Sequence, residues 1–430
     1  MPERHKSDAK RITRREFLQR SAAGAAALGL GTWGPLAPPS VWGANERINL
    51  GVIGCGGRGT HLLRDLVSRS QREPDKLKVI AVCDIYEPRK RKAREISGAQ
   101  VFHEYTEMLE LEDLDAVVIA TPDHWHAQMS IDAMEAGKDV YCEKPMTLYW
   151  EDAKRVAQVQ ARTGRVFQCG AQSASEDRWW QANRLIREGA MGKLIWSQGG
   201  YFRNVPGGDW NYGLGPVDLE DPKGPNYLDW KRFLGPAPWR PFDPERYFRF
   251  RKFWDYSGGI ATDLLYHSLA HLQIALGPQF PKRVVASGGN YVHFDREVPD
   301  TFHILIDYPA EEGAKDPTTG HTVALAGTQG NRAGLPDLIR GQEATMYFEG
   351  PGIVVRPQSP FRDRRPEMRV KSEPRSGHMS NFIECVLTRQ QPHLNAQTAY
   401  KIMVAIGLAV QSYREGKVMR FDPEKEELIA

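Results

Sequence analysis

Short apolar runs alternate with amphipathic segments over residues 48 to about 172. The apolar runs predict buried strands at 48–53, 78–83, 116–120, 139–142 and 166–169. The segments between them have helical periodicity and predict helices at 62–68, 88–96, 127–136 and 151–163. Strands that alternate with helices in this way are typical of a parallel, doubly wound α/β sheet.

The pattern changes after residue 173, where crossover helices no longer separate the apolar segments. Strands are predicted at 193–203, 282–291, 301–308, 322–327 and 345–355, with helices at 179–188, 262–276 and 398–414. We expect a C-terminal α/β domain with a mainly antiparallel, open sheet. Because such a sheet leaves one face to bury, we also expect a homo-oligomer, either a dimer or a tetramer.

Residues 204–256 are rich in Pro, Gly and aromatic residues and are too irregular for a sheet. We expect a long ordered loop there, close to the functional cleft.

The first 44 residues do not belong to either pattern. Arg14 and Arg15 precede a weakly apolar run rich in Ala and Gly, and small residues follow near Ala44. This order resembles a twin-arginine export leader, which predicts an exported, periplasmic protein. An uncleaved leader that acts as an anchor is the alternative, and we expect no other membrane span. The chain is therefore predicted to consist of a leader, residues 1–44, an N-terminal domain, residues 45–172, and a C-terminal domain, residues 173–430.

Charge and cysteine content narrow the classes of function. Seven of the 57 Lys and Arg residues and three of the 54 Asp and Glu residues lie in the leader, so the remainder is nearly neutral. This balance argues against a nucleic-acid surface. The five cysteines include no C-x-x-C pair and predict no disulfide framework. A protein that folds in the cytoplasm before export, as a bound cofactor requires, fits this composition.

A glycine-rich sequence directly follows the first predicted strand. Gly54, Cys55, Gly56, Gly57, Arg58 and Gly59 form a G-x-G-x-x-G motif where a strand should lead into a helix. This arrangement can hold a dinucleotide pyrophosphate on backbone N–H groups. Asp84 ends the next strand, where its carboxylate can accept hydrogen bonds from a ribose and repel a 2′-phosphate, so NAD is favoured over NADP. The alternative is a glycine-rich turn with Asp84 as a strand-end cap.

Two further motifs follow predicted strands at the carboxyl edge of the sheet, where open α/β sheets bind ligands. Ala120-Thr121-Pro122-Asp123-His124-Trp125-His126 is the first, and its alternative interpretation is a helix N-cap beside two surface histidines. We expect no metal there, because His124 and His126 should point apart and no third ligand is evident. Cys142-Glu143-Lys144-Pro145 is the second, and its lysine is expected to reach the cleft unless it is a solvated loop residue.

Asp263 and His267 lie four residues apart on a predicted helix that follows a pair of glycines. This spacing places carboxylate and imidazole on one helical face, so the acid is expected to orient or polarise the base. A structural Asp-His pair is the alternative.

Together the glycine motif, Thr-Pro-Asp-x-x-His, Glu-Lys-Pro and Asp-x-x-x-His resemble the glucose-fructose oxidoreductase/inositol dehydrogenase (Gfo/Idh/MocA) family, over essentially the whole chain after the leader. The resemblance implies a Rossmann domain followed by an α/β domain whose sheet faces pair in oligomers. It also implies that Lys144 is the catalytic lysine and that Asp263 and His267 are the acid and the proton-accepting histidine. Leu265 departs from the family pattern, which commonly has glycine there. The implied cofactor-binding residues are Gly54, Cys55, Gly56, Gly57, Arg58, Gly59, Asp84, Thr121, Pro122, Asp123, His126, Glu143 and Lys144.

The sequence therefore predicts an exported NAD-dependent oxidoreductase that acts on a secondary hydroxyl of a sugar, glycoside or polyol. Free NAD is expected to be scarce outside the cytoplasm, so the cofactor should be tightly held. The alternative is a redox-neutral glycosidase, lyase or epimerase that oxidises a hydroxyl transiently. A non-catalytic sugar-binding protein is disfavoured because Lys144, Asp263 and His267 are all present. Aromatic residues expected to stack on a sugar are Trp179, Trp180, Tyr201, Trp210, Tyr212, Trp230, Trp254 and Tyr256.

Overall fold

The computed structural model describes residues 47–310 and 320–429. The predicted leader, residues 1–44, lies outside the described residues. Within the described ranges, no helix combines the length and the apolar character that crossing a membrane would need.

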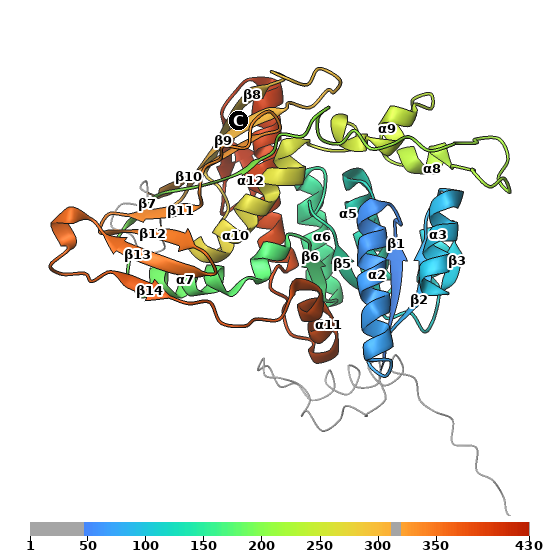
Figure 1. Cartoon of the computed structure of the whole chain (residues 1–430), viewed down its shortest axis with the longest axis horizontal. Helices are drawn as coiled ribbons and strands as arrows, with labels where there is room; N and C mark the ends of the chain where they lie inside the picture. The colour runs from blue at the N-terminus through green and yellow to red at the C-terminus, as the bar shows by residue number, and fades with distance from the viewer. Residues whose placement is uncertain (1–46, 311–319, 430) are drawn as a thin grey trace, which may run out of the picture. The chain divides into compact units, whose positions relative to one another are not determined.

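The first layer of the described chain is a parallel sheet of six strands (Figure 1). Its order, β3-β2-β1-β4-β5-β6, confirms the predicted doubly wound sheet. The strands are β1 (Ile48–Ile53), β2 (Leu77–Cys83), β3 (Gln100–Phe102), β4 (Ala116–Ile119), β5 (Asp139–Cys142) and β6 (Phe167–Cys169). The helices that connect them are α2 (Gly57–Arg72), α3 (Glu87–Ser97), α4 (Tyr105–Leu109), α5 (Asp123–Glu135) and α6 (Trp150–Thr163).

The sequence missed one part of this layer, the edge strand β3 and the short helix α4. β3 has only three residues and none of them is buried, so it lacks the apolar run that identified the other strands. The five cysteines are buried and free, which agrees with the absence of a predicted disulfide framework.

A second sheet of ten strands forms the C-terminal layer. Its order is β14-β13-β12-β11-β7-β10-β9-β8-β15-β16, and all its pairs are antiparallel except β7 with β10. The prediction of a mainly antiparallel open sheet is therefore confirmed. Its strands are β7 (Leu194–Phe202), β8 (Arg283–Gly289), β9 (Thr301–Tyr308), β10 (His321–Thr328), β11 (Leu338–Gly341), β12 (Ala344–Glu349), β13 (Gly352–Pro357), β14 (Met368–Val370), β15 (Met419–Asp422) and β16 (Glu427–Ile429).

The single strand predicted at 345–355 is wrong, because β12 and β13 form a hairpin over these residues. The chain reverses at Gly350, whose φ of +58° lies in the left-handed region that favours glycine. The apolar character continues through the turn and hides it in the sequence pattern.

Helices cover one face of the second sheet and continue onto the first layer. They are α7 (Asp177–Arg187), α10 (Tyr266–Leu276), α11 (His378–Thr388) and α12 (Ala396–Glu415), and a π-helical turn (Ala261–Leu265) leads into α10. Met379 and Phe382 of α11 lie in the same apolar cluster as the strands β1 and β2. The predicted C-terminal domain thus contributes a helix to the core of the N-terminal one.

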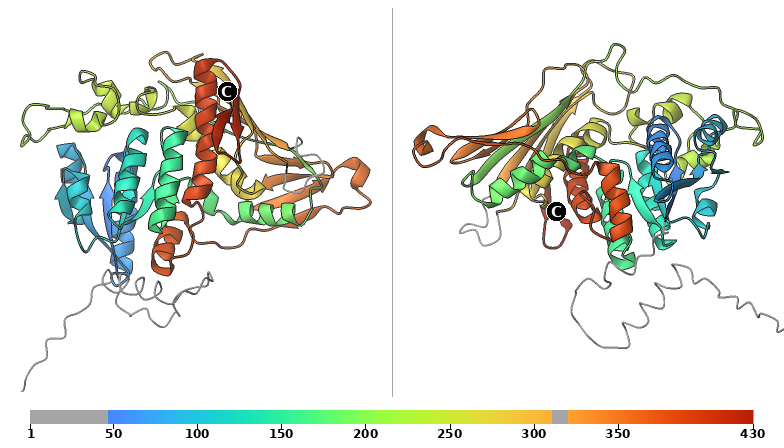
Figure 2. Two further views of the ribbon diagram at one scale, coloured as in Figure 1. Left: turned by 180° about the vertical axis from the view of Figure 1, so that it is seen from behind. Right: turned by 60° about the horizontal axis from the view of Figure 1, so that its bottom comes forward.

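Residues 204–256, here called the strap, lie across the carboxyl edge of the parallel sheet (Figures 1 and 2). The strap contains α8 (Trp230–Leu234), α9 (Pro244–Phe248) and a 3-10 turn (Phe250–Lys252), and otherwise is irregular. This confirms the predicted ordered loop. Backbone hydrogen bonds attach it to the chain after β2, from Glu87 N to Tyr227 O and from Asp229 N to Ile85 O.

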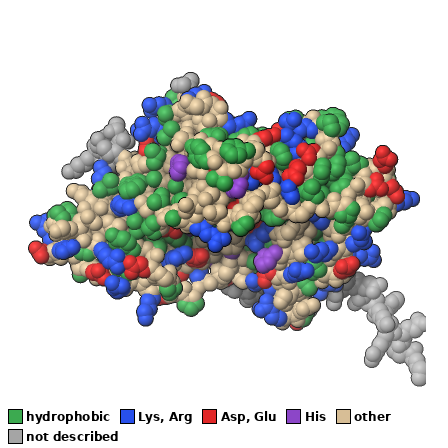
Figure 3. All heavy atoms as spheres, turned by 45° about the horizontal axis from the view of Figure 1, so that its top comes forward, with side chains coloured by type: hydrophobic (Ala, Val, Ile, Leu, Met, Phe, Trp, Pro, Cys, Tyr) green, Lys and Arg blue, Asp and Glu red, His purple; other side chains and the backbone are tan. Residues whose placement is uncertain are grey.

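Basic and acidic side chains are interspersed on the face shown in Figure 3. This distribution agrees with the near balance of charge outside the leader.

Candidate active site

The glycine-rich loop after β1 has the backbone geometry that a bound pyrophosphate requires. Gly54 has φ of +85°, and a Cβ there would lie 2.9 Å from the carbonyl of Ala120. A Cβ on Gly59 would lie 1.8 Å from Gly54 O. At Gly57, where α2 begins, a Cβ would meet nothing within 4 Å, and the capping residue Gly56 has no side chain to satisfy the first N–H groups. The loop therefore leaves an open cradle at a helix N-terminus, and NAD fits it.

Asp84 follows β2 and faces this loop. Its Oδ2 accepts from Cys55 N at 2.7 Å, and its Oδ1 accepts from Tyr86 N at 3.0 Å. Because a carboxylate oxygen has two lone pairs, both oxygens retain a site for a ribose hydroxyl. Asp84 thus shapes the glycine loop and also lies at the wall of the cavity described next.

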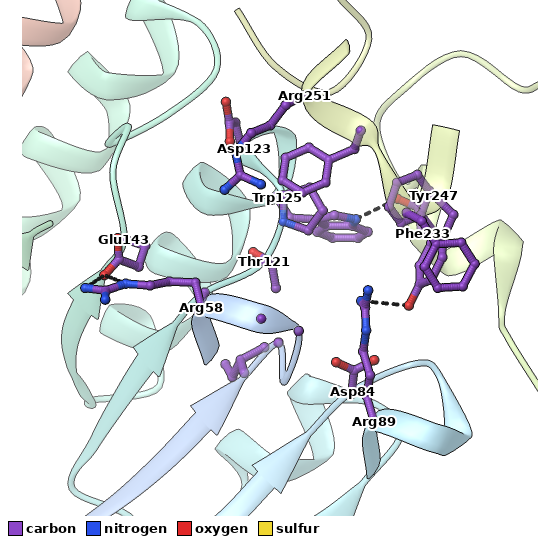
Figure 4. A pocket seen from close by; sticks show the side chains of 18 of the residues that line it. Arg58, Asp84, Arg89, Thr121, Asp123, Trp125, Glu143, Phe233, Tyr247 and Arg251 are labelled. Carbon is purple, nitrogen blue, oxygen red and sulfur yellow. Dashed lines mark hydrogen bonds and ion pairs between the residues drawn. The ribbon is translucent and has the colours of Figure 1, made fainter. Parts of the chain in front are cut away.

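A cavity of about 830 Å³ runs from Asp84 to the π-helical turn, between the parallel sheet and the strap. This volume lies in the upper part of the range for ligand sites, roughly 300–1,000 Å³. Figure 4 shows Asp84, Thr121 and Glu143 on one side of the cavity and Tyr247 and Arg251 of the strap on the other. The predicted site residues that line it are Gly54, Gly56, Gly57, Arg58, Asp84, Thr121, Pro122, Asp123, Glu143, Lys144, Asp263 and His267.

Three predicted cofactor residues do not line the cavity, namely Cys55, Gly59 and His126. The Cys55 side chain is buried, and Gly59 packs against Gly54. His126 is buried with Nδ1 2.7 Å from Pro145 O and Nε2 2.9 Å from Thr121 O. It joins the loops after β4 and β5, so its role in the structure is to fix these loops rather than to face a ligand.

Thr121 and Asp123 occupy the loop after β4. The Thr121 hydroxyl is buried and has no hydrogen-bond partner among the described residues. A buried hydroxyl at a cavity wall needs a partner, and a polar group of bound NAD would supply one. The Asp123 carboxylate instead accepts from the hydroxyls of Ser257 and Thr262, and its burial raises its pKa.

Glu143 and Arg58 form an ion pair within the cavity wall (Figure 4). Glu143 Oε1 accepts from Arg58 Nε at 2.8 Å and from Arg58 Nη2 at 2.7 Å. Burial acts to raise the pKa of Glu143, but the charge of Arg58 outweighs it and holds this pKa below its ordinary value. The pair joins the glycine loop to the end of β5, next to Lys144.

Lys144 reaches from the parallel sheet to Asp263 on the π-helical turn. Its Nζ donates to Asp263 Oδ1 at 2.5 Å and to the Asp263 carbonyl at 2.9 Å. An ammonium has three protons, so one N–H remains for a substrate oxygen in the cavity. Two residues of the strap also donate to the Asp263 carboxylate. Arg251 Nε donates to Oδ1 at 2.8 Å, and Trp210 Nε1 donates to Oδ2 at 3.1 Å. Burial acts against the charge of Asp263, but the two cations lower its pKa well below the ordinary range.

His267 lies one residue into α10 and lines the same end of the cavity. Burial lowers its pKa to about 3, and the charge of Lys144 acts in the same direction. The imidazole is therefore neutral at neutral pH and is able to accept a proton.

The sequence predicts that Asp263 orients or polarises His267, and the structure shows no hydrogen bond between these two described side chains. Both carboxylate oxygens bond to Lys144, Arg251 and Trp210, and Asp263 acts on His267 only through its charge. The segments that supply these partners are remote in sequence, so helical spacing could not reveal them.

Two of the eight aromatic residues expected to stack on a sugar line the cavity, namely Tyr201 and Tyr212. Trp179 is fully buried and stacks on His271 with ring centroids 4.0 Å apart. Trp230 and Tyr256 belong to a buried aromatic cluster under the strap, and Trp210 bonds Asp263.

Sequence reasoning missed the cavity residues Arg89, Arg203 and Arg251. Arg203 is the last residue of the strand predicted at 193–203, but arginine at a strand end is common and carries no specific signal. Within the described residues, no group of three or more His, Cys, Asp and Glu side chains could hold a metal ion.

Two family models match the chain. The model of the Gfo/Idh/MocA oxidoreductase family for the NAD-binding Rossmann fold matches residues 48–171. The model for the C-terminal alpha/beta domain of the same oxidoreductase family matches residues 181–315, so that together they span more than half of the chain.

Curated relatives match the chain over less than half of their own length. A glycosyl hydrolase family 109 protein of Stenotrophomonas maltophilia is 32% identical over 214 residues, which are 47% of this chain and 45% of the relative. An inositol 2-dehydrogenase of Rubrobacter xylanophilus is 30% identical over 164 residues, which are 38% of this chain and 46% of the relative.

Solved structures share the fold at low sequence identity. Levoglucosan dehydrogenase in complex with NADH and L-sorbose has a TM-score of 0.65 at 17% identity, covering 87% of this chain and 99% of the other. The WlbA dehydrogenase from Bordetella pertussis, in complex with NADH and UDP-GlcNAcA, has a TM-score of 0.61 at 17% identity, covering 88% and 99%.

Proposed function

The chain belongs to the Gfo/Idh/MocA oxidoreductase family, and we propose that it is an exported enzyme that oxidises a secondary hydroxyl of a sugar, glycoside or polyol with tightly bound NAD. The observation that carries this proposal is the arrangement of Lys144, Asp263 and His267 at one end of the cavity, with the glycine cradle at the other. Inositol 2-dehydrogenases among the relatives support the class of substrate.

The residues of the cavity divide the chemistry between them. NAD, when bound, supplies the acceptor for the hydride of the carbinol. The free N–H of Lys144 holds the carbinol oxygen and stabilises the charge that develops there. His267, neutral and close to the same end, accepts the hydroxyl proton. Asp263 fixes Lys144 in place through its carboxylate and its carbonyl.

Tight retention of NAD is supported by the strap. It meets the parallel sheet around Asp84, at the expected adenosine end of the cavity. Tyr86 Oη donates to Pro216 O at 2.6 Å, Arg89 Nη1 donates to Tyr247 Oη at 2.9 Å, and His124 Nε2 lies 2.8 Å from Phe233 O. A nucleotide beneath these contacts leaves only when they open.

The test of retention uses the protein purified without added nucleotide. We expect one NAD per chain, released by denaturation but not by extensive dialysis, and no NADP. Release on dialysis, or NADP as the released nucleotide, would contradict the proposal.

A redox-neutral reaction is the second candidate, and the glycosyl hydrolase family 109 relative favours it. In that case the same site would oxidise a ring hydroxyl transiently and return the hydride after bond cleavage. Product analysis separates the two candidates, since oxidised sugar in stoichiometric amount supports the first and glycoside cleavage without net oxidation supports the second.

Export rests on Arg14 and Arg15, which lie outside the described residues. Replacing both by lysine should leave the protein in the cytoplasm, where fractionation of cells detects it. Unchanged export of this variant would refute the twin-arginine route.

Assembly into a homo-oligomer is supported by the open face of the second sheet. Trp196 and Leu305 lie on that face and are 37% and 50% exposed. Light scattering of the purified protein should give the mass of a dimer or tetramer. A monomeric mass at micromolar concentration would contradict this proposal.

A further inference from the structure

Two arginines lie beside the proposed reaction centre, and the chemistry described above assigns neither of them a contact with the substrate. Arg203 directly follows β7, and Arg251 lies on the strap. Both line the cavity together with Lys144, Asp263 and His267. The charge of Asp263 acts on both guanidinium groups and raises the pKa of each.

Arg203 has donors that no described residue satisfies. Its Nη2 donates to Tyr201 Oη at 3.3 Å, and its Nη1 lies 3.7 Å from Asp209 Oδ2, beyond hydrogen-bond distance. Its guanidinium stacks over the Tyr201 ring at 4.9 Å, and its side chain is 37% exposed at the cavity wall. The stacking restrains the plane of the guanidinium, and the side chain lines the cavity.

Asp209 forms a long ion pair with Arg203, because its buried Oδ2, which has no hydrogen-bond partner among the described residues, lies 3.7 Å from Arg203 Nη1. The carboxylates of Asp263, Asp123 and Glu143 are occupied by other groups. Asp263 is shared between Lys144 and Arg251, and Asp123 is held by the hydroxyls of Ser257 and Thr262. Glu143 is paired with Arg58. Asp209 is therefore an ion-pair partner of Arg203 but does not lie at hydrogen-bond distance from it. An anionic group of a ligand would make the hydrogen bonds that Asp209 does not make.

We propose that the substrate is an acidic sugar, a hexuronic acid or its glycoside, whose carboxylate is bound by Arg203 while a secondary carbinol of the same ring lies at Lys144 and His267. Arg251 lines the same cavity, but its Nε is committed to Asp263. A planar guanidinium held by stacking matches the geometry of a carboxylate, which it binds through two parallel N–H donors. This inference rests on the proposed oxidation of a sugar hydroxyl and names the substrate class of that same site.

The experiment compares matched sugars on the NAD-loaded protein. Methyl glycosides of glucuronic acid and galacturonic acid are each compared with the methyl ester of the same uronide and with the parent hexoside. Nicotinamide reduction is measured in a single turnover, and binding to the NADH-loaded protein is measured by calorimetry. The variants are Arg203→Gln and Arg203→Lys, with Arg187→Gln as a control that removes one positive charge from an exposed position on α7.

A free uronide should be favoured over its ester and over the hexoside by at least about 10-fold, the scale of one charged hydrogen-bonded contact. Arg203→Gln should reduce this preference to about 3-fold or less, Arg203→Lys should keep an intermediate preference, and Arg187→Gln should leave it unchanged. Circular dichroism and nucleotide content identify a variant that has failed to fold, in which case the wild-type comparison with the ester decides.

Equal reduction of uronide and ester by the wild type, or a preference that survives Arg203→Gln, would overturn the inference and leave the proposed oxidation intact. If neither acidic nor neutral sugars reduce the nicotinamide, the proposed function itself fails, and this inference fails with it.

Discussion

Arg251 donates through Nε to Oδ1 of Asp263, the same carboxylate oxygen that accepts from Lys144. The strap thus reaches past the proposed cofactor site and touches the group that positions the lysine. One segment therefore both lines the cavity and contacts Asp263 at the proposed reaction centre.

Removing the arginine should therefore slow chemistry more than it weakens binding. We expect Arg251→Met to reduce the rate constant of nicotinamide reduction by about 10- to 100-fold, the effect of a misplaced catalytic group. Arg251→Lys should recover part of the lost rate, because it restores a positive charge beside Asp263. NAD content should stay at the wild-type level in both. An effect on the substrate KM alone would show that Arg251 does not position the reaction centre.

The two ends of the glycine loop should respond differently to alanine. A Cβ at Gly57 meets no protein atom, so Gly57→Ala should fold with unchanged or slightly higher thermal stability. The added methyl enters the space expected for the pyrophosphate and should weaken NAD binding at least about 10-fold, as overpacking of a tight contact does.

Gly59→Ala is the matched variant, because its Cβ would lie 1.8 Å from Gly54 O. We expect this protein to be poorly folded, as judged by circular dichroism and thermal denaturation. A well-folded Gly59→Ala protein, or full NAD content in Gly57→Ala, would contradict the account of the loop.

Truncation of the strap core should release the cofactor. Phe233 is 2% exposed and packs edge-on against Tyr247 and Tyr256 of the strap. Phe233→Ala removes this core contact, worth about 3–5 kcal/mol in a well-packed site. NAD should then be lost on dialysis, and hydrogen exchange of the strap should quicken.

Phe348→Ala serves as the control, since Phe348 packs on Trp179 away from the strap. It should lower thermal stability without loss of NAD. Retention of NAD in Phe233→Ala would show that the strap does not hold the cofactor.

The glycine cradle, the strand-end Asp84 and the cavity residue Lys144 could be located from the sequence because each depends on local order. A strand followed by glycines and a helix, or a motif at a strand's carboxyl end, places its residues at one edge of a parallel sheet. The partners of Asp263 could not be found in this way. Lys144 is 119 residues away and Trp210 is 53 residues away, and only the folded chain brings them together.

The strap is a second case in which the sequence could not identify the site residues. Its composition indicated an ordered loop near the cleft, but aromatic residues look alike in a core and in a sugar site. Trp230 and Tyr256 turned out to form the strap's own core, while Tyr201 and Tyr212 face the cavity. Burial distinguishes a core aromatic residue from one that faces the cavity, but an irregular segment has no sequence periodicity that would predict which residues are buried.

Acid should destabilise the protein through its buried histidines. Burial lowers the pKa of His124, His321 and His378 to about 4. The unfolded chain binds these protons near pH 6.5, so between about pH 6.5 and 4 it holds more protons than the folded chain, and stability falls as pH falls. Above about pH 7 these histidines are neutral in both the folded and the unfolded chain, so they do not change the free energy of unfolding with pH.

His321→Gln tests this dependence away from the cavity, on a histidine that is 9% exposed and stacks on Tyr308. Between pH 6.5 and 4.5 the free energy of unfolding should fall less in the variant than in the wild type, by an amount on the order of 2 kcal/mol. Thermal denaturation at several pH values measures this as a shallower fall of Tm. An identical slope in the two proteins would contradict the low pKa of His321.

The central claim is that Lys144 and His267 act on the same carbinol oxygen, and single-turnover reduction of the bound nicotinamide tests it most directly. The wild type, Lys144→Ala, His267→Ala and the double variant are loaded with NAD and mixed with the sugar that the wild type oxidises fastest. Circular dichroism and nucleotide content confirm that each is folded and loaded. We predict that each single variant slows reduction by at least about 10²-fold, the scale of a positioned acid or base, and that the double variant falls well short of the product of the two losses. Reduction at near wild-type rates in either single variant would contradict the mechanism.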